Sequence, residues 1–353
     1  DGSLQPSAPV GRNLIINGNM AIDQRNAGAS VTPAADGYTL DRWNVLISQA
    51  SKFSVEQTIS GVVAPVGFTD YLGCTSLSAY SVLTADYFTV RQAIEGFNIA
   101  DLGWGTANAK TVTLSFWVRS SVTGTFGGSF QNSTSARSYP YTYTISSANT
   151  WEQKSVTIAG DTSGTWQTGN STGIFIYFGL GVGSTFSGTA GAWAGSNFVS
   201  ATGATSVVGT SGATFYITGV QLEANTTATP FENLQYGTQL LLCQRYLPAF
   251  SGISNWFGYG IIVNSSALYS TVTYKVPTRV APTGLVISSA SHFRCGDFIA
   301  TNNGVSAISI SSAGTDTALL GVTSSVANLT AARPGTFYPS SASSLLYFTG
   351  CEL

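Results

Sequence analysis

The sequence predicts an all-β protein with an N-terminal jelly-roll β-sandwich, a short connecting helix and a smaller C-terminal β domain. Segments in which apolar and polar residues alternate occur along most of the chain, and turns rich in Gly, Ser, Thr and Asn separate them. A single segment places apolar residues at helical spacing. Many short strands between such turns are typical of sandwiches and jelly rolls.

The strand pattern is clearest in two segments. Residues 173–183 put five apolar side chains on one face and leave Phe175, Tyr177 and several glycines on the other. In residues 214–223 the apolar residues change from odd to even positions midway, with Gly219 at the change. This pattern predicts a β-bulge.

One helix is predicted over residues 233–247, with Pro230 before it and Pro248 after it. Its apolar stripe consists of Tyr236, Leu240, Cys243 and Leu247. Polar residues such as Gln239 and Gln244 are expected to face outward. An isolated helix of this length is marginal in water, so packing must hold it.

The order of these segments divides the chain into an arm, two β domains and a connector. We expect an N-terminal arm over residues 1–12, a jelly-roll domain over 13–232, the connector helix over 233–250 and a β tip domain over 251–353. The helix stripe would be covered in a homotrimer with the helices near its threefold axis. The alternative is a monomer in which the helix packs between its own two β domains.

The composition excludes several classes of protein. Hydrophobic residues make up 43% of the chain and charged residues only 8%, with a net charge of −2, so the chain is not of the disordered type. No basic stripe is present to neutralise phosphates, so nucleic acid is not expected as a partner. No apolar run approaches the roughly 20 residues that span a bilayer, so membrane insertion is not expected. The four cysteines form no C-x-x-C pair and are expected to be reduced thiols.

Motifs at the two ends of the N-terminal domain carry a family resemblance. They are NLIINGNM (13–20), DQR (23–25), YTLDRW (38–43), ITGVQLE (217–223), ATPFE (228–232) and LCQRY (242–246). In this order they resemble bacteriophage tail fibre and tail-associated proteins, and the first and last strands resemble those of jelly-roll carbohydrate-binding modules. A second Tyr often follows the last motif in that family, whereas this chain has Leu247.

The resemblance implies a virion protein without catalytic activity or cofactor. Such a protein is usually a homotrimer that joins other tail proteins and attaches to a host cell-surface glycan or protein. Its place would be the virion, after assembly in the cytoplasm of the bacterial host. The alternatives are a polysaccharide-cleaving tailspike and a purely structural virion fibre.

Modules of the resembled shape often hold a structural calcium, but no metal site is predicted for this chain. Thr218 and Gly219 stand where a pair of Asp residues often lies. Oxygen ligands would have to come from Asn17, Asp23 or Glu223.

Catalytic arrangements are weak in the sequence, and no catalytic residue is assigned. His292 lies near Cys295 and Asp297, but three residues along a strand reverse the face, which does not pair a nucleophile with its base. A glycosidase needs two carboxylates about 5–9 Å apart. Asp161 and Glu152, both near tryptophans, are the available carboxylates, and the sequence does not pair them.

Aromatic residues give the stronger binding signal, because flat rings with a polar tip stack on sugar faces. Several are expected in polar loops: Tyr139, Tyr141, Tyr143, Trp151, Trp166, Trp193, Trp256, Tyr259 and Tyr338. The last domain of a tail fibre usually meets the cell first. Receptor or glycan contacts are therefore predicted at Trp256, Tyr259, Tyr338 and His292.

The charged residues of the end motifs are expected to be structural. They are Asp23, Arg25, Asp41, Arg42 and Glu223. Buried charges persist only when they are paired and hydrogen-bonded. We expect Arg42 to make a bidentate contact to a carboxylate or to backbone carbonyls and to tie the first strand to the last.

Overall fold

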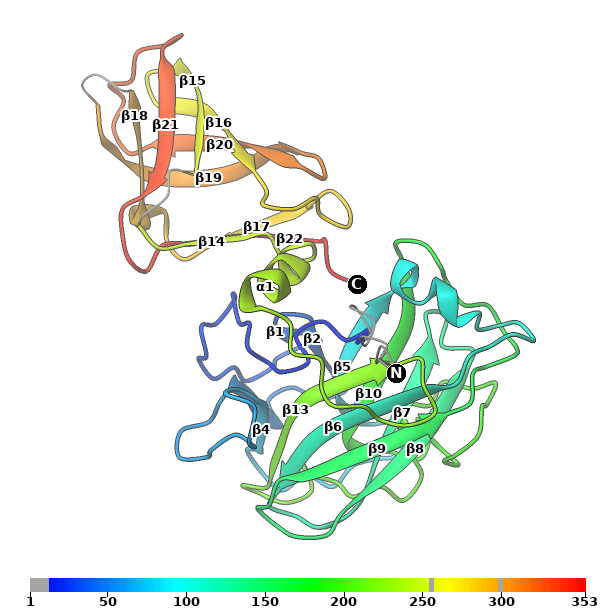
Figure 1. The fold of residues 1–353 in the computed structure, drawn as a ribbon. Helices are drawn as coiled ribbons and strands as arrows, with labels where there is room; N and C mark the ends of the chain where they lie inside the picture. The colour runs from blue at the N-terminus through cyan, green and yellow to red at the C-terminus, as the bar shows by residue number, and fades with distance from the viewer. Residues whose placement is uncertain (1–12, 254–256, 298–300) are drawn as a thin grey trace, which may run out of the picture. The chain divides into compact units, whose positions relative to one another are not determined.

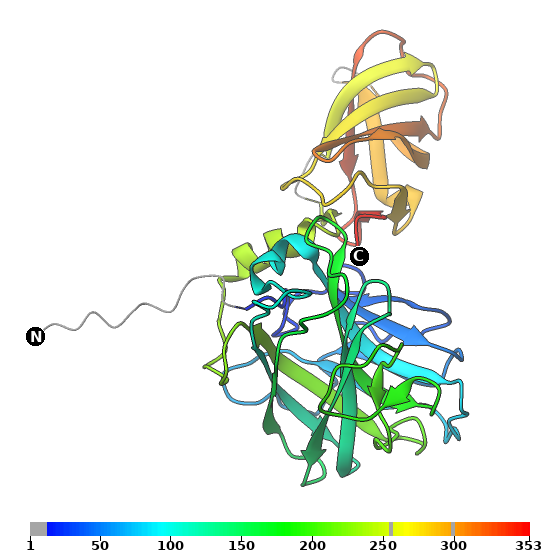
Figure 2. The same cartoon turned by 90° about the vertical axis from the view of Figure 1, so that its right-hand side faces the viewer.

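The computed structural model describes residues 13–253, 257–297 and 301–353. The chain divides into two compact units, the first ending at Gln239 and the second running from Leu240 to Glu352. The regular structure of both units is almost entirely antiparallel strand, so the prediction of an all-β fold is confirmed (Figures 1 and 2). Within the described residues no helix is long and apolar enough to cross a membrane.

The first unit is a jelly-roll-like sandwich of two sheets. The six-stranded sheet has the order β1 (Gly37–Leu40), β2 (Trp43–Ile47), β5 (Tyr87–Glu95), β10 (Thr172–Val182), β7 (Gly124–Asn132), β8 (Ser138–Ile145). The five-stranded sheet has the order β3 (Phe53–Gln57), β4 (Leu72–Ser76), β13 (Thr214–Glu223), β6 (Val112–Ser120), β9 (Glu152–Ile158). A small parallel pair, β11 (Ser187–Gly188) and β12 (Ser200–Ala201), lies outside both sheets.

The core of this unit lies between the two sheets. It is formed by the inward side chains of each strand, such as Ile176 and Phe178 of β10 and Phe116 of β6, all fully buried. Because side chains alternate along a strand, Phe175 and Tyr177 of β10 lie on the outer face, as the sequence pattern predicts.

The predicted bulge in β13 is present. The pairing of β13 with β6 shifts register between Thr218 and Gln221. Gly219 has a φ of +60°, and a Cβ there would lie 2.6 Å from Cζ of Phe68. Glycine is therefore required at this point by both backbone conformation and space.

The two end motifs of the sandwich lie against each other. The backbone N–H of Leu14 donates to the carbonyl of Leu222, and Val220 N–H donates to the carbonyl of Gly18. Asn13 Oδ1 accepts the N–H of Leu222 at 3.0 Å. This pairing joins the start of the domain to its last strand and explains why the motifs occur together.

The connecting helix α1 (Tyr236–Gln244) is shorter than the predicted 233–247. Cys243 is buried, as is Leu247 just past the helix, whereas Tyr236 is 64% exposed. The expectation that Gln239 and Gln244 face outward is wrong, because both are buried. Gln239 Nε2 donates to Asn19 Oδ1 at 2.6 Å, and a hydrogen-bonded amide can be buried at low cost.

The second unit contains a closed barrel and a small sheet. The barrel has the order β15 (Gly258–Asn264), β16 (Ala267–Thr273), β20 (Thr317–Ser324), β19 (Asn303–Ala313), β18 (Phe293–Asp297), β21 (Pro334–Pro339). The three-stranded sheet has the order β14 (Ala249–Ser251), β22 (Leu345–Thr349), β17 (Gly284–Ile287). These strands share a second hydrophobic core, separate from that of the sandwich.

The four cysteines are free and buried, as expected of reduced thiols: Cys74, Cys243, Cys295 and Cys351. Burial raises the pKa of the Cys351 thiol to about 11 and also raises the pKa of Cys295. These thiols therefore stay protonated at neutral pH and serve as packing groups.

Candidate functional site

A row of polar and aromatic side chains crosses the outer face of the six-stranded sheet. Strand register sets Asn44 of β2 opposite Arg91 of β5, and Arg91 opposite Tyr177 of β10. On the other side of β10, Phe175 lies opposite Gln131 of β7. Side chains directly opposite each other on neighbouring strands lie on the same face of the sheet. The row is therefore fixed by the pairing that builds the sandwich.

A directed chain of hydrogen bonds connects these side chains. Arg91 donates through Nε to Asn44 Oδ1 at 3.2 Å and through Nη1 to Tyr177 Oη at 3.2 Å. Tyr177 Oη then donates to Gln131 Oε1 at 3.0 Å, and Gln131 Nε2 donates to Asn197 Oδ1 at 2.7 Å. Since Tyr177 and Gln131 are almost fully buried, these hydrogen bonds hold the side chains at the two ends, Asn44 and Asn197, in one geometry.

Aromatic rings support the guanidinium group of Arg91. Its Cζ lies 4.6 Å from the ring centroid of Phe175 and 5.7 Å from that of Tyr177. A planar cation over a ring face is held by cation–π attraction. Tyr87 and Phe186 add an edge-to-face ring pair nearby, with centroids 5.2 Å apart. Hydrogen bonds and rings together fix the position of the Arg91 head group.

These groups line a cleft of about 380 Å³, within the size range of small-molecule sites. Its lining consists of Leu46, Tyr87, Arg91, Gln131, Ser133, Ser135, Phe175, Tyr177, Phe186, Asn197 and Val199. Arg91 is the one charged residue of this lining. The cleft therefore combines rings, neutral hydrogen-bonding groups and one fixed positive charge.

The hydroxyl of Tyr177 acts as a neutral bridge in this cleft. Burial raises its pKa; the charge of nearby Arg91 lowers it, and that of Asp36 raises it, leaving a net increase above the ordinary value. The hydroxyl of Tyr177 therefore stays protonated and donates a hydrogen bond to Gln131 Oε1. The phenol contributes hydrogen-bond geometry and no charge.

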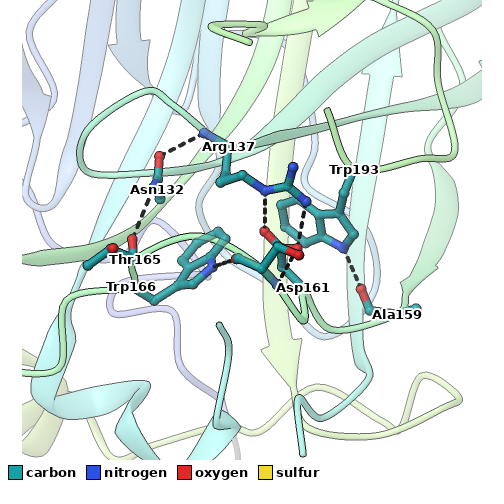
Figure 3. Close-up of polar contacts among 8 residues, drawn as sticks. Asn132, Arg137, Ala159, Asp161, Thr165, Trp166 and Trp193 are labelled. Atoms are coloured by element: carbon teal, nitrogen blue, oxygen red, sulfur yellow. Dashed lines mark hydrogen bonds and ion pairs between the residues drawn. The ribbon is translucent and has the colours of Figure 1, made fainter. Parts of the chain in front are cut away.

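The carboxylates considered for glycan cleavage are held by structural contacts. Asp161 is buried and accepts both Nε and Nη2 of Arg137 at 2.7 Å, as Figure 3 shows. Glu152 forms an ion pair with Lys154 at 2.5 Å and accepts two backbone N–H groups. The Lys154 contact, assisted by those N–H groups, lowers the pKa of Glu152, which favours the ionised form. Each carboxylate is therefore engaged by a neighbouring cation of the sandwich.

Most of the aromatic residues expected in polar loops belong to the packing of the sandwich. Tyr141 and Tyr143 lie in β8 and are buried in the core, so their expected loop position is wrong. Trp166 and Trp193 pack edge to face with Trp104, and the Trp193 indole donates to the carbonyl of Ala159 (Figure 3). Strand alternation puts the two β8 tyrosines inside, whereas Trp166 and Trp193 lie outside the strands, as expected, and pack against Trp104.

Of the predicted contacts of the C-terminal domain, Tyr259 and Tyr338 lie in barrel strands and His292 lies in a short 3-10 helix before β18. Tyr259 in β15 is 60% exposed. Tyr338 in β21 donates its hydroxyl to Asn302 Oδ1 at 2.6 Å, and His292 Nδ1 lies 2.9 Å from Ser288 Oγ. Trp256 lies outside the described residues. Receptor contact by these side chains stays a prediction.

Each charged residue of the end motifs has a local bonding role. Asp23 accepts the N–H groups of its own loop at Asn26 and Gly28, and Asp41 accepts the backbone and side chain of Gln24. Arg25 lies 5.5 Å from the ring centroid of Tyr38. Glu223 accepts N–H and Oγ1 of Thr229, which closes the turn after β13.

Arg42 is fully buried rather than extended into solvent. Its Nη2 donates to the backbone carbonyl of Ala93 in β5. The bonded carbonyl lies within the six-stranded sheet. The expected tie from Arg42 to the last strand stays a prediction.

The side chains suggested for calcium do not fit a metal site. Asn17 Oδ1 accepts the N–H of Ile22, and the oxygens of Asp23 and Glu223 accept protons from their own turns. No group of three or more potential metal-ligating His, Cys, Asp or Glu side chains occurs in the described part of the chain. A calcium needs six to eight oxygens, and these oxygens are committed to hydrogen bonds.

Sequence reasoning missed most of the cleft lining, including its hydrogen-bonding members Arg91, Gln131 and Asn197. The available signal was the pair Phe175 and Tyr177, which alternation places on the outer face of a central strand. The register of three strands brings Arg91 and Gln131 to this pair, and Asn197 comes from the loop before β12.

No protein-family model and no curated protein sequence matches this chain. Among solved structures, it is similar to the enzymatically active domain of tailspike protein 4 of bacteriophage CBA120, with 12% identity and a TM-score of 0.34. That match covers 61% of this chain and 22% of the tailspike chain. A family 11 carbohydrate-binding module from Clostridium thermocellum is 9% identical over 56% of this chain and 98% of its own, with a TM-score of 0.30. A putative sugar-binding protein from Bacteroides thetaiotaomicron is 13% identical over 60% of this chain and 100% of its own, with a TM-score of 0.32.

Proposed function

We propose that this chain is a non-catalytic, glycan-binding protein of a bacteriophage tail fibre or a similar virion appendage, and that the cleft of the first unit takes the glycan. One observation carries the proposal: the ring of Phe175 and the fixed head group of Arg91 stand together in a cleft on a rigid sheet. Sugars present apolar faces for stacking and hydroxyl groups for hydrogen bonds, and such a cleft supplies partners for both.

The virion role is supported by the end motifs and by composition. The motifs resemble those of tail fibre proteins, and they pair with each other to close the sandwich. A charge content of 8% suits a long-lived assembly, here a homotrimer that joins other tail proteins. Free, buried cysteines suit assembly in a bacterial cytoplasm before incorporation into the virion.

Retention on an array of purified bacterial capsular and O-antigen polysaccharides tests the proposal. The unmodified protein is expected to be retained by at least one polysaccharide. Phe175→Ala removes the ring beside Arg91 and is expected to abolish that retention, whereas Tyr259→Ala on the barrel leaves it unchanged. Retention lost with Tyr259→Ala alone would move the binding site to the C-terminal domain.

Cleavage of the bound polysaccharide is the competing function. Incubating the retained polysaccharide with the protein and measuring its chain length distinguishes the two, because a tailspike shortens the polymer and a binding protein does not. If no polysaccharide is retained and the purified protein fails to block phage adsorption to host cells, a purely structural fibre is the better description.

A further inference from the structure

Arg91 is the one charged residue among those lining the cleft. In the described part of the chain no carboxylate forms an ion pair with it. Its partners among the described residues are two neutral oxygens, Asn44 Oδ1 and Tyr177 Oη, and two ring faces. An arginine that is held in place without a counter-charge offers its positive charge to a ligand.

Two amide oxygens of the cleft already accept hydrogen bonds from neighbouring side chains. Gln131 Oε1 accepts from both Tyr177 and Ser135, and Asn197 Oδ1 accepts from Gln131. Among the described residues, Arg91 Nη2 and Asn197 Nδ2 donate to no protein oxygen. A ligand group that only accepts hydrogen bonds therefore fits here better than a hydroxyl, which must also donate.

We propose that the glycan bound in this cleft is acidic, and that Arg91 Nη2 and Asn197 Nδ2 bind the carboxylate of a uronic acid or similar sugar. The inference rests on the proposed function and names the substrate class of the same site. Guanidinium groups form strong charge-assisted hydrogen bonds with carboxylates. Phe175 and the neutral polar groups would then contact the rest of the sugar.

Carboxyl reduction of the ligand tests the role of the acid. The probes are the acidic and neutral capsular polysaccharides of the array, each acidic one in its native and its carboxyl-reduced form. We expect retention by acidic members only, and a roughly 10- to 100-fold loss of affinity after reduction, because a hydrogen bond to a charged group is removed. Affinity for the native form should fall as salt is raised, as a single ion pair requires.

Asn197→Asp tests the donor end of the cleft in the protein. The new carboxylate still accepts the Gln131 Nε2 bond, but it replaces the Nδ2 donor with a negative charge that repels an acid. Asn197 is exposed, so the fold is expected to tolerate the change. Asn108→Asp, also exposed, changes the net charge equally and is the matched control. Arg91→Gln is a second variant that removes the cation, with the melting temperature recorded to exclude unfolding.

The outcomes separate the two proposals. Loss of acidic retention in Asn197→Asp and Arg91→Gln, with Asn108→Asp unchanged, supports the inference. Equal binding of native and carboxyl-reduced polymers, or retention lost only on removal of phosphate groups, overturns it. If neutral polysaccharides are retained and Phe175→Ala releases them, glycan binding stands and the acidic ligand is wrong. If no polysaccharide is retained, the glycan proposal itself fails.

Discussion

Arg91 in β5 and Tyr177 in β10 are direct cross-strand partners, and Arg91 Nη1 donates to Tyr177 Oη at 3.2 Å. On the opposite face of β10, Ile176 and Phe178 are fully buried in the core of the sandwich. A one-residue slip of this strand would exchange its two faces, so the core locks the register of the cleft. The site is therefore as rigid as the sheet that carries it.

Two neighbouring tyrosines of β8 should respond oppositely to loss of their hydroxyls. The buried Tyr141 Oη donates to the carbonyl of Tyr177 at 2.8 Å, whereas the buried Tyr143 Oη has no hydrogen-bond partner among the described residues. We expect Tyr141→Phe to lower the free energy of unfolding by about 1–2 kcal/mol. Tyr143→Phe should leave it unchanged or raise it, since an unsatisfied polar group leaves the core.

Urea unfolding of both variants beside the unmodified protein measures the difference. Each substitution removes one oxygen from a ring in the same strand, so each is the control for the other. A larger loss for Tyr143→Phe than for Tyr141→Phe would contradict the hydrogen-bond assignment.

The sequence was sufficient for the fold because the fold depends on local alternation. Residues 173–183 and 214–223 alternate so regularly that strand, face and bulge follow from spacing alone, and β10, β13 and Gly219 match them. The predicted range of the helix is too long, because the flanking prolines limit where a helix can lie without fixing the residue at which it begins. The outward placement of Gln239 failed because its partner, Asn19, is distant in sequence.

The cleft could be predicted only in part, for the same physical reason. Alternation places Phe175 and Tyr177 on the outer face of β10, but Arg91 is 86 positions from Tyr177, and its pairing depends on which strands are neighbours. The sequence also suggested sugar-binding loops at Tyr141 and Tyr143, since aromatic rings in polar surroundings look alike in loops and in alternating strands.

Stability in acid should depend on Asp86, which precedes β5 beside the cleft. Burial by itself would raise the pKa of this carboxyl, but hydrogen bonds from Leu83 N–H, Tyr80 and Ser48 lower it below the ordinary 3.8. A lowered pKa in the folded state adds stability that is complete above 3.8 and is lost as the pH falls through the folded value.

The variant Asp86→Asn should therefore cost stability at pH 7 and much less at pH 2. Urea midpoints of variant and unmodified protein at both pH values measure this. Asp101 is 67% exposed and forms an ion pair with Lys110. Asp101→Asn breaks this pair and is expected to have little effect at either pH. An equal deficit for Asp86→Asn at the two pH values would contradict the role of ionisation.

The proposed homotrimer gives helix α1 a testable surface. Leu241 and Leu242 are 43% and 36% exposed, and Tyr236 is 64% exposed. We expect light scattering to give about three times the 36.7 kDa of one chain. Replacing Leu241 and Leu242 by Ser should reduce that mass, whereas Val326→Ser, at a 50% exposed site on the barrel unit, should not. A mass of one chain that stays constant on concentration would refute the trimer.

Two glycine-to-alanine substitutions should have opposite effects on stability. Gly219 stands at the β13 bulge with a φ of +60°, and an added Cβ would lie 2.6 Å from Phe68 Cζ. We expect Gly219→Ala to lower the free energy of unfolding by about 2 kcal/mol or more, from left-handed backbone strain together with the clash. Gly237 lies in α1 with no atom near the position of a Cβ, so Gly237→Ala should raise it by up to about 0.5 kcal/mol through helix propensity. Thermal unfolding of the two variants measures both effects, and a Gly219→Ala variant as stable as the unmodified protein would show that the bulge does not require glycine.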